Sequence, residues 1–244
     1  MATLFDAIRS SFVDQWWLFK LICSVYVLYF TIYKAEQYIP SPELRNIFYL
    51  IIFLFFLGCS AVSIKRNLNN QHPLFPGITN AIEVVSMAIG GFISILIGSI
   101  VSAIFVWFME SFLIPLFPSD NLVIKYVFDC LALLFAFPFI IIPLILYCKD
   151  GKLSDAFKFE VISQTAGAYF TAILNVLVQF LCIYGLAYVC LYFLLIQMFG
   201  KVDLFINVLN CTIIVVAFFT TMVCLSENYD LRIKNDIEEI IKKT

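Results

Sequence analysis

The stretch from residue 81 to residue 116 constrains the fold most, because it is long, apolar and almost uncharged. Its charged residues are Glu83 and Glu110. About 20 apolar residues cross a bilayer as a helix, so this stretch is long enough to do so. Small residues recur in it at every fourth position: Ser86, Gly90, Ser94, Gly98 and Ser102. In lipid, such a row lets two helix backbones approach closely, so we expect this stripe to pack against another helix of the chain or of a second copy.

The composition of the whole chain agrees with a membrane environment. Hydrophobic residues make up 63% of the 244 residues and charged residues 13%, whereas a soluble domain has about 25% charged residues. The net charge of −2 and the lack of a dense basic patch argue against nucleic acid as a partner. The eight cysteines lie in or beside apolar runs without a CxxC pair, far in sequence from the single histidine, His72. We therefore expect buried thiols, and neither a metal site nor a disulfide framework.

Six apolar runs are candidates for membrane spans. They cover residues 16–33, 46–64, 81–116, 122–148, 166–199 and 204–225. The fifth is too long for one perpendicular span and too short for two, so we expect one tilted or protruding helix. Charges precede the first run and no signal-peptide cleavage site follows it, so this run is expected to stay in the protein. The sequence predicts an all-α polytopic membrane protein with a single membrane domain, residues 1–225, and an amphipathic tail, residues 226–244.

Lysine and arginine predict the orientation of these spans. The N-terminus, residues 65–80, residues 148–165 and the tail carry ten of them, and the opposite side carries three, Lys34, Arg45 and Lys201. Because cytoplasmic loops are enriched in Lys and Arg, we expect both termini in the cytoplasm of a cell-membrane protein.

An internal repeat is suggested by an Asp or Asn followed by Ala. The motif occurs at Asp6, Asn80 and Asp155, with spacings of 74 and 75 residues. Each copy precedes an odd-numbered span and has apolar residues at helical spacing, which predicts an amphipathic helix on the cytoplasmic interface. The predicted interfacial helices are residues 3–14, 77–87 and 153–164. The corresponding repeats, each an interfacial helix with two spans, are 4–64, 77–147 and 153–225; chance similarity in an apolar sequence is the alternative.

Two segments resemble a known family. They are Gly-Lys-Leu-Ser-Asp-Ala-Phe-Lys-Phe at residues 151–159, followed by a long helix, and the Asn- and Pro-containing loop at residues 67–76. With these segments the chain is similar to an uncharacterised family of six-span prokaryotic membrane proteins, called domain of unknown function 4013. The resemblance implies a six-span fold and no activity, so it assigns no functional residues.

Polar residues inside the apolar runs are the candidates for chemistry. Lys125 and Asp129 are four residues apart and so share a helix face, and Asn175 and Asn207 could join them in an intramembrane polar site. One interpretation is a proton or cation relay at Asp129. The other is a neutralised ion pair near the outer interface, with the asparagines forming interhelical hydrogen bonds.

These observations leave two main classes of function. The sequence contains no Gly-rich phosphate loop, HExxH or GxSxG motif, so we expect no enzyme and no cofactor. The first class is a non-enzymatic scaffold or accessory subunit that contacts lipid, a protein partner or a second copy at its cytoplasmic face. The second is a small-molecule or ion permease that uses polar groups around Asp129. The scarcity of polar residues in the spans favours the first.

Overall fold

A computed structural model describes residues 3–11, 16–71, 74–77, 80–113, 122–199 and 202–243. The regular structure in these residues is helical throughout. Its elements are α1 (Leu4–Ser11), α2 (Trp17–Tyr29), the π-helix η1 (Phe30–Lys34), α3 (Ala35–Tyr38), α4 (Pro42–Leu68), α5 (Ala81–Leu113), α6 (Leu122–Asp150), the 3-10 helix η4 (Leu153–Phe157), α7 (Phe159–Phe180), the π-helix η5 (Leu181–Gly185), α8 (Leu186–Phe199) and α9 (Asp203–Lys243).

Five helical segments among the described residues are long and apolar enough to cross a membrane. Large apolar side chains such as Ile100, Trp107 and Phe193 remain exposed on them, and soluble monomers rarely expose apolar surface on this scale. These helices indicate a multi-pass membrane protein. They are Trp17–Tyr38, Pro42–Leu68, Ala81–Met109, Tyr169–Met198 and Asp203–Tyr229, and they coincide with the first, second, third, fifth and sixth apolar runs. The fourth run forms α6, but part of it lies outside the described side chains, so the sixth span stays a prediction.

The boundaries of α4 follow from its sequence. Ser41 precedes the helix in an extended conformation, and its side-chain oxygen accepts a hydrogen bond from the Leu44 N–H. Pro42 occupies the first helical position, where its missing N–H costs nothing. Lys65 and Arg66 lie in the last turn, where positive charge suits the helix dipole. The polar residues from Asn67 onward then end the apolar run.

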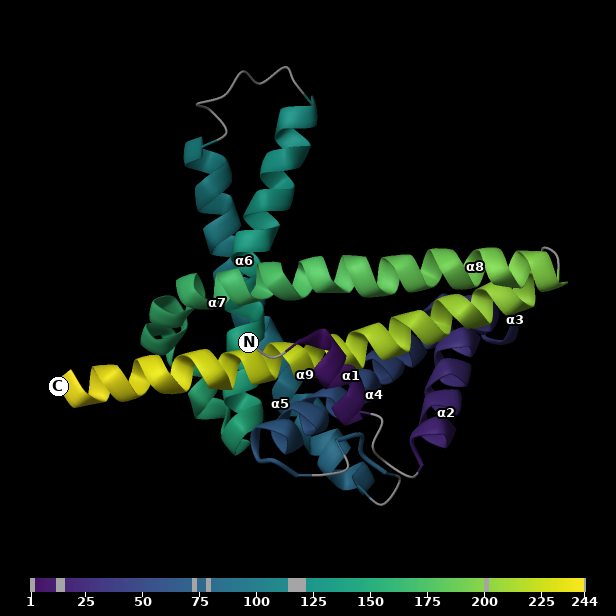
Figure 1. The fold of residues 1–244 in the computed structure, drawn as a ribbon, viewed down its shortest axis with the longest axis horizontal. Coiled ribbons are helices and arrows are strands. Elements are labelled where there is room, and N and C mark those ends of the chain that lie inside the picture. Colours follow the sequence, from purple (N-terminus) through teal and green to yellow (C-terminus); the bar gives the residue numbers. More distant parts are fainter. Residues whose placement is uncertain are drawn as a thin grey trace.

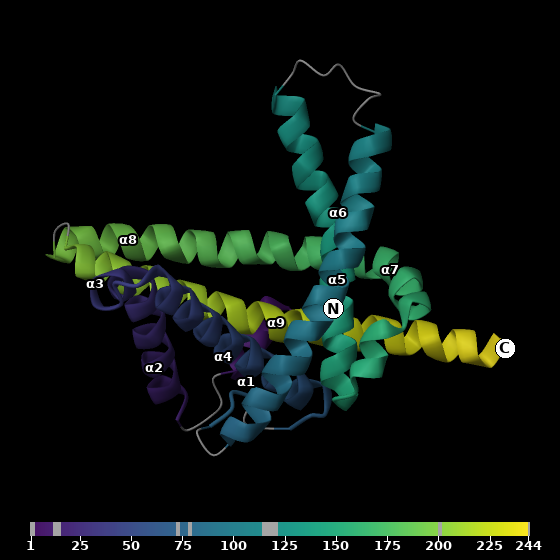
Figure 2. The ribbon, with the colours of Figure 1, turned by 180° about the vertical axis from the view of Figure 1, so that it is seen from behind.

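The long helices pair in hairpins that extend outward from a shared central region (Figure 1). The far ends of α5 and α6 project as one arm, and α8 runs beside the first part of α9 towards a second tip, as the view from behind also shows (Figure 2). Helix α5 packs against α4 and α6, so it is one organising helix of the fold. Helix α9 packs against α1, α2, α4, α7 and α8, so it is a second organising helix.

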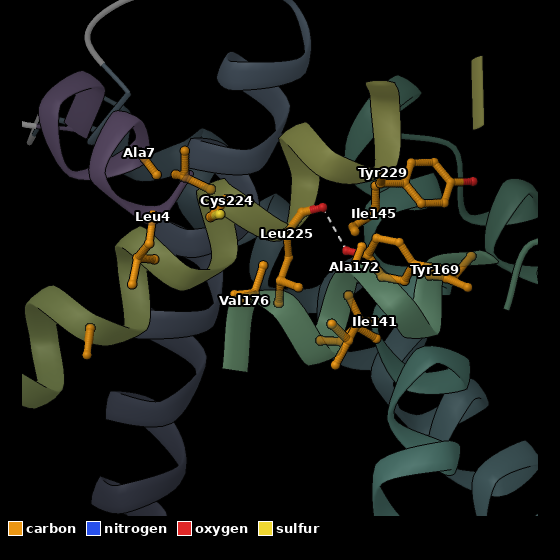
Figure 3. Close-up of a cluster of buried hydrophobic side chains, with 14 of the residues drawn as sticks. Leu4, Ala7, Ile141, Ile145, Tyr169, Ala172, Val176, Cys224, Leu225 and Tyr229 are labelled. Atoms are coloured by element: carbon orange, nitrogen blue, oxygen red, sulfur yellow. Dashed lines mark hydrogen bonds between the residues drawn. The ribbon is translucent and has the colours of Figure 1, made fainter. Parts of the chain in front are cut away.

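Two clusters of buried side chains form the core. One lies among α1, α6, α7 and α9, with Leu4, Ile142, Tyr169 and Leu225 among its members (Figure 3). The other lies among α2, α4, α5, α6, η4 and α9. The hydroxyl of the fully buried Tyr169 donates a hydrogen bond to the Leu225 carbonyl at 2.7 Å, which ties α7 to α9.

Two of the three predicted interfacial helices do not have the predicted bounds. Helix α1 is a separate short helix, and residues 12–14 of the expected range lie outside the described residues. Residues 81–87, by contrast, are the first turns of α5, since the apolar sequence after Asn80 continues the helix without a breaking residue. Residues 153–164 are also interrupted, because Lys158 leaves helical geometry with a ψ angle of 68° and separates η4 from α7.

The last two apolar runs form longer helical units than single spans. Residues 159–199 are helical throughout, as α7, η5 and α8, in agreement with one long helix for the fifth run. The sixth run and the tail form one helix, α9, because no glycine or proline follows Leu225 to end it. The tail is therefore a continuation of the span, and it extends past the other helices in Figure 1. The side chains of residues 230–243 lie outside the described part of the structure.

Candidate functional site

The small-residue stripe of α5 faces α6. A Cβ atom added at Gly98 would lie 2.7 Å from the Ile140 Cα and still closer to the Phe139 carbonyl oxygen. The two backbones are therefore in contact at this level, which a side chain at residue 98 would prevent. One turn further on, the buried Ser102 hydroxyl donates a hydrogen bond to the Ala136 carbonyl at 2.9 Å.

The other half of the stripe receives the ring of Tyr147 from α6. A Cβ atom at Gly90 would lie 2.6 Å from Tyr147 Cε2. The Tyr147 hydroxyl donates a long hydrogen bond, 3.4 Å, to the Ser86 carbonyl, and the buried Ser94 hydroxyl donates to the Gly90 carbonyl. Ser86 is the exposed member of the stripe. The stripe thus contacts a helix of the same chain along most of its length.

The candidate intramembrane polar site is not assembled from its two described asparagines. The side chains of Lys125 and Asp129 lie outside the described residues, although both belong to α6. Asn175 lies on α7 and Asn207 near the start of α9. The hydroxyls of Tyr184 and Thr220 form a hydrogen bond between η5 and α9. Along this pair of helices, the bond lies between the position of Asn175 and the position of Asn207. At 1.5 Å per helical residue, Asn175 and Asn207 are about 30 Å apart along this antiparallel pair.

Asn175 instead takes part in an attachment of α1. Its side-chain oxygen accepts a hydrogen bond from the Gln179 amide at 3.3 Å. The Gln179 oxygen accepts one from the Leu4 N–H at 2.8 Å. Leu4 and Ala7 are fully buried and lie close to Cys224 of α9 (Figure 3). The sequence does not predict this contact, because one glutamine in an apolar helix does not reveal which backbone group it binds.

The start of α1 is stabilised by a reciprocal pair of hydrogen bonds. The Thr3 N–H and hydroxyl donate to the Asp6 carboxylate at 3.4 Å and 2.6 Å, and the Asp6 N–H donates to the Thr3 hydroxyl oxygen. This arrangement is a capping box, which satisfies backbone N–H groups that the helix leaves unpaired. The hydrogen bond from the Thr3 hydroxyl also lowers the pKa of the Asp6 carboxyl.

Charged and polar residues gather where α4 ends, α5 begins and α9 passes. The Glu83 carboxylate of α5 binds Lys65 Nζ at 3.0 Å and Arg66 Nη2 at 3.3 Å. The Asn67 amide donates to the Ser226 hydroxyl of α9 at 3.2 Å. We call these five residues, Lys65, Arg66, Asn67, Glu83 and Ser226, the polar junction. Glu83 lies in the first turn of α5, where a carboxylate suits the helix dipole. The sequence alone does not reveal its two cationic partners on α4.

Removing the carboxylate at the polar junction is expected to destabilise the fold modestly. Glu83→Gln leaves two cations beside each other, of which the Arg66 side chain is only 12% exposed. We expect a loss of about 1 kcal/mol in unfolding free energy at low salt, because the Lys65 and Glu83 side chains are each about one-third exposed and screened.

The matched control for this variant is Glu36→Gln, which removes the exposed ion pair with Arg45. The unfolding free energy of each variant is measured in detergent at low and at high salt. Glu83→Gln should cost more than Glu36→Gln, and its cost should shrink as salt screens the wild-type pairs. Equal costs for the two variants would contradict a structural role for the polar junction.

A small cavity lies between α2, the loop at residues 74–77 and α9. Its volume is about 30 Å³, enough for about two water molecules. Lys20 of α2 forms part of its wall and donates a hydrogen bond to the Phe75 carbonyl at 2.9 Å. The remaining lining residues are Trp17, Leu21, Phe75, Val215, Val216, Phe219 and Thr220. The lysine therefore fixes the loop after α4 onto α2.

The cysteines and acidic residues form no metal site in the described part of the chain. No three His, Cys, Asp or Glu side chains lie close enough there to hold a metal ion. The seven cysteines whose side chains are described are free thiols. Cys59, Cys148, Cys211 and Cys224 are buried as expected, whereas Cys23, Cys182 and Cys190 are exposed.

Comparisons with protein families, with curated proteins and with solved structures found no match to this chain.

Proposed function

We propose that this protein is a non-enzymatic scaffold or accessory subunit that works through its cytoplasmic face. The observation that carries the proposal is the position of its polar contacts. Three polar contacts of the described residues lie at α9 or at the end of α4. The polar junction joins α4 to α9, α1 packs on α9, and the loop held by Lys20 lies beside α9. Apart from hydrogen bonds such as Tyr184–Thr220 and Ser102–Ala136, the spans pack through apolar and small residues, which suits a structural element more than a solute pathway.

The membrane topology that we propose has six spans with both termini in the cytoplasm. Helix α6 supplies the sixth span, because it contains 29 mostly apolar residues, enough for a bilayer crossing. The ten-to-three distribution of Lys and Arg sets the orientation. An even number of spans also returns the chain to the side on which it began. The contact of α1 with α9 is compatible with this topology.

We further propose that the internal repeat and the resemblance to domain of unknown function 4013 reflect a common six-span plan. Two of the three motifs have the same local geometry, since Asp6 accepts a hydrogen bond from the Thr3 N–H and Asn80 from the Gly77 N–H, in each case three residues earlier. The following alanines differ, because Ala7 is buried whereas Ala81 is exposed. The shared hydrogen bond therefore supports a repeat of the motif at the helix start. It does not support equivalence of the helices that follow.

Photo-crosslinking in native membranes tests the proposed function. A crosslinking amino acid at Phe5, on the exposed side of α1, should capture the same single protein in repeated experiments. The same amino acid at Phe108, on the projecting arm of α5, is the control and should capture lipid. The partner should also co-purify with the wild-type chain in a fixed ratio.

The permease alternative gives the opposite result. Purified protein in liposomes would then carry a proton or cation flux above that of empty liposomes, and Asp129→Asn would abolish it. Such a flux, together with no specific crosslink from Phe5, would overturn the scaffold proposal.

A further inference from the structure

Two neighbouring elements, the first turns of α5 and the 3-10 helix η4, both expose large apolar side chains. On α5, Ile82 is 88% exposed and Val85 is also exposed. On η4 and at the start of α7, Phe157 is 49% exposed and Phe159 nearly as much, with their rings 6.5 Å apart. We call these four residues the α5–η4 patch. Helix η4 packs against α5 and α6, so both parts of the patch belong to one region of the molecule.

The buried sides of the two elements hold the patch in place. Val84 and Met87 of α5 belong to the same buried cluster as Ala156 of η4. The Asp155 carboxylate binds Lys158 Nζ at 2.8 Å, which closes the turn from η4 into α7. The exposed side chains therefore project from fixed backbone and are not part of a free loop.

The patch continues the apolar surface of a membrane-spanning helix. The span Ala81–Met109 has 29 residues, which is about 43 Å of helix against a hydrocarbon thickness of about 30 Å. Exposed apolar residues follow it from Ile82 through Val85 and Ile89 to Ile100 and Ile104. The end at Ile82 therefore extends beyond the hydrocarbon if the helix is upright, or meets its edge if the helix is tilted.

The charges around the patch suit a bilayer surface without an excess of anionic lipid. Residues 149–160 contain three lysines, at 149, 152 and 158, and three carboxylates, at 150, 155 and 160. Lys149 and Lys152 are exposed, and long lysine side chains can place their charge in water while their stems cover apolar surface. The charges of residues 149–160 balance, so apolar burial provides the attraction of this segment.

We propose that the α5–η4 patch inserts into the headgroup–acyl boundary of the leaflet that the polar junction faces. Its occupant is thus lipid, which leaves α1 and the tail for a protein partner. Burial of Phe157 and Phe159 fixes η4 at this depth, so the patch sets the position of the polar junction relative to the membrane surface. This inference rests on the proposed membrane topology but not on the scaffold function.

Depth-dependent tryptophan quenching tests the proposal with the full-length protein. The three native tryptophans are replaced by phenylalanine, and Phe157→Trp then supplies the only fluorophore. The matched control is Ser154→Trp, an exposed polar position on the same 3-10 helix. Each protein is reconstituted into phosphatidylcholine liposomes whose lipids carry bromine close to the headgroup or near the chain end. Aqueous iodide reports exposure to water.

The expected result is that the fluorophore of the Phe157→Trp protein is quenched more strongly by shallow than by deep bromine and is shielded from iodide, whereas the Ser154→Trp protein shows more iodide quenching. Addition of anionic lipid should leave both patterns unchanged. If iodide quenches the Phe157→Trp protein strongly and brominated lipid does not quench it, the proposal is overturned. The patch would then be a surface for a protein partner. Insertion only with anionic lipid would also overturn it. Phe159→Trp provides an independent second position, and neither result depends on a Phe5 crosslink.

Discussion

Gly98→Leu is expected to prevent stable packing of α5 on α6. The added Cβ alone would lie 2.7 Å from the Ile140 Cα, and backbone cannot move aside as a flexible side chain can. Overpacking costs about 1–3 kcal/mol where side chains can adjust, so we expect about 3 kcal/mol or more here. The protein should unfold at a clearly lower temperature in detergent, as circular dichroism measures.

Gly185→Leu is the matched control for this variant. Gly185 is exposed on η5, and a Cβ atom there would meet no other atom within 4 Å. It should therefore unfold close to the wild-type temperature. Gly98→Ala should be intermediate, because it adds the clashing atom without the remaining bulk. If Gly98→Leu unfolds like wild type, the close backbone contact between α5 and α6 does not exist.

Leu4→Glu is expected to detach α1 from the core. Leu4 is fully buried between α7 and α9, and a carboxylate in its place would have to leave the apolar site. Loss of the burial of one leucine, about 2 kcal/mol, would raise the detached fraction roughly 30-fold. Cys224, which is buried below α1 in Figure 3, should become accessible.

The measurement is the rate at which a water-soluble maleimide labels Cys224 in a chain whose other seven cysteines are replaced by alanine. The matched control is Phe5→Glu, because Phe5 is the next residue on α1 and is 70% exposed. The label should react much faster with the Leu4→Glu protein than with Phe5→Glu or the parent. Equal rates for Leu4→Glu and Phe5→Glu would show that α1 does not cover Cys224.

The sequence predicts the helices well because spans depend on local composition. The apolar runs at residues 46–64 and 81–116 appear as α4 and α5, and Gly90, Gly98 and Ser102 of the small-residue stripe contact α6. Helix ends are less predictable. The sequence from Leu225 to Asp230 contains polar residues but no glycine or proline, so α9 continues into the tail.

Contacts between distant residues could not be predicted in the same way. The Asn67–Ser226 hydrogen bond joins residues 159 positions apart, and the Leu4–Gln179 bond joins residues 175 apart. Periodicity shows which face of a helix is polar, but it does not show which helix that face meets. The two described asparagines of the candidate polar site do not meet, since Asn175 and Asn207 lie at different heights along the α7–α9 pair.

Reporter fusions at the two termini test the six-span topology most directly. A protein that fluoresces only in the cytoplasm is fused before Met1 or after Thr244, and an enzyme that is active only outside the cytoplasm is fused at the same two positions. With α6 as a sixth span, both fluorescent fusions should be bright and both enzyme fusions inactive. The five spans found in the described residues, without α6, would place the termini on opposite sides. Activity of the enzyme at one terminus and fluorescence at the other would therefore contradict the six-span topology.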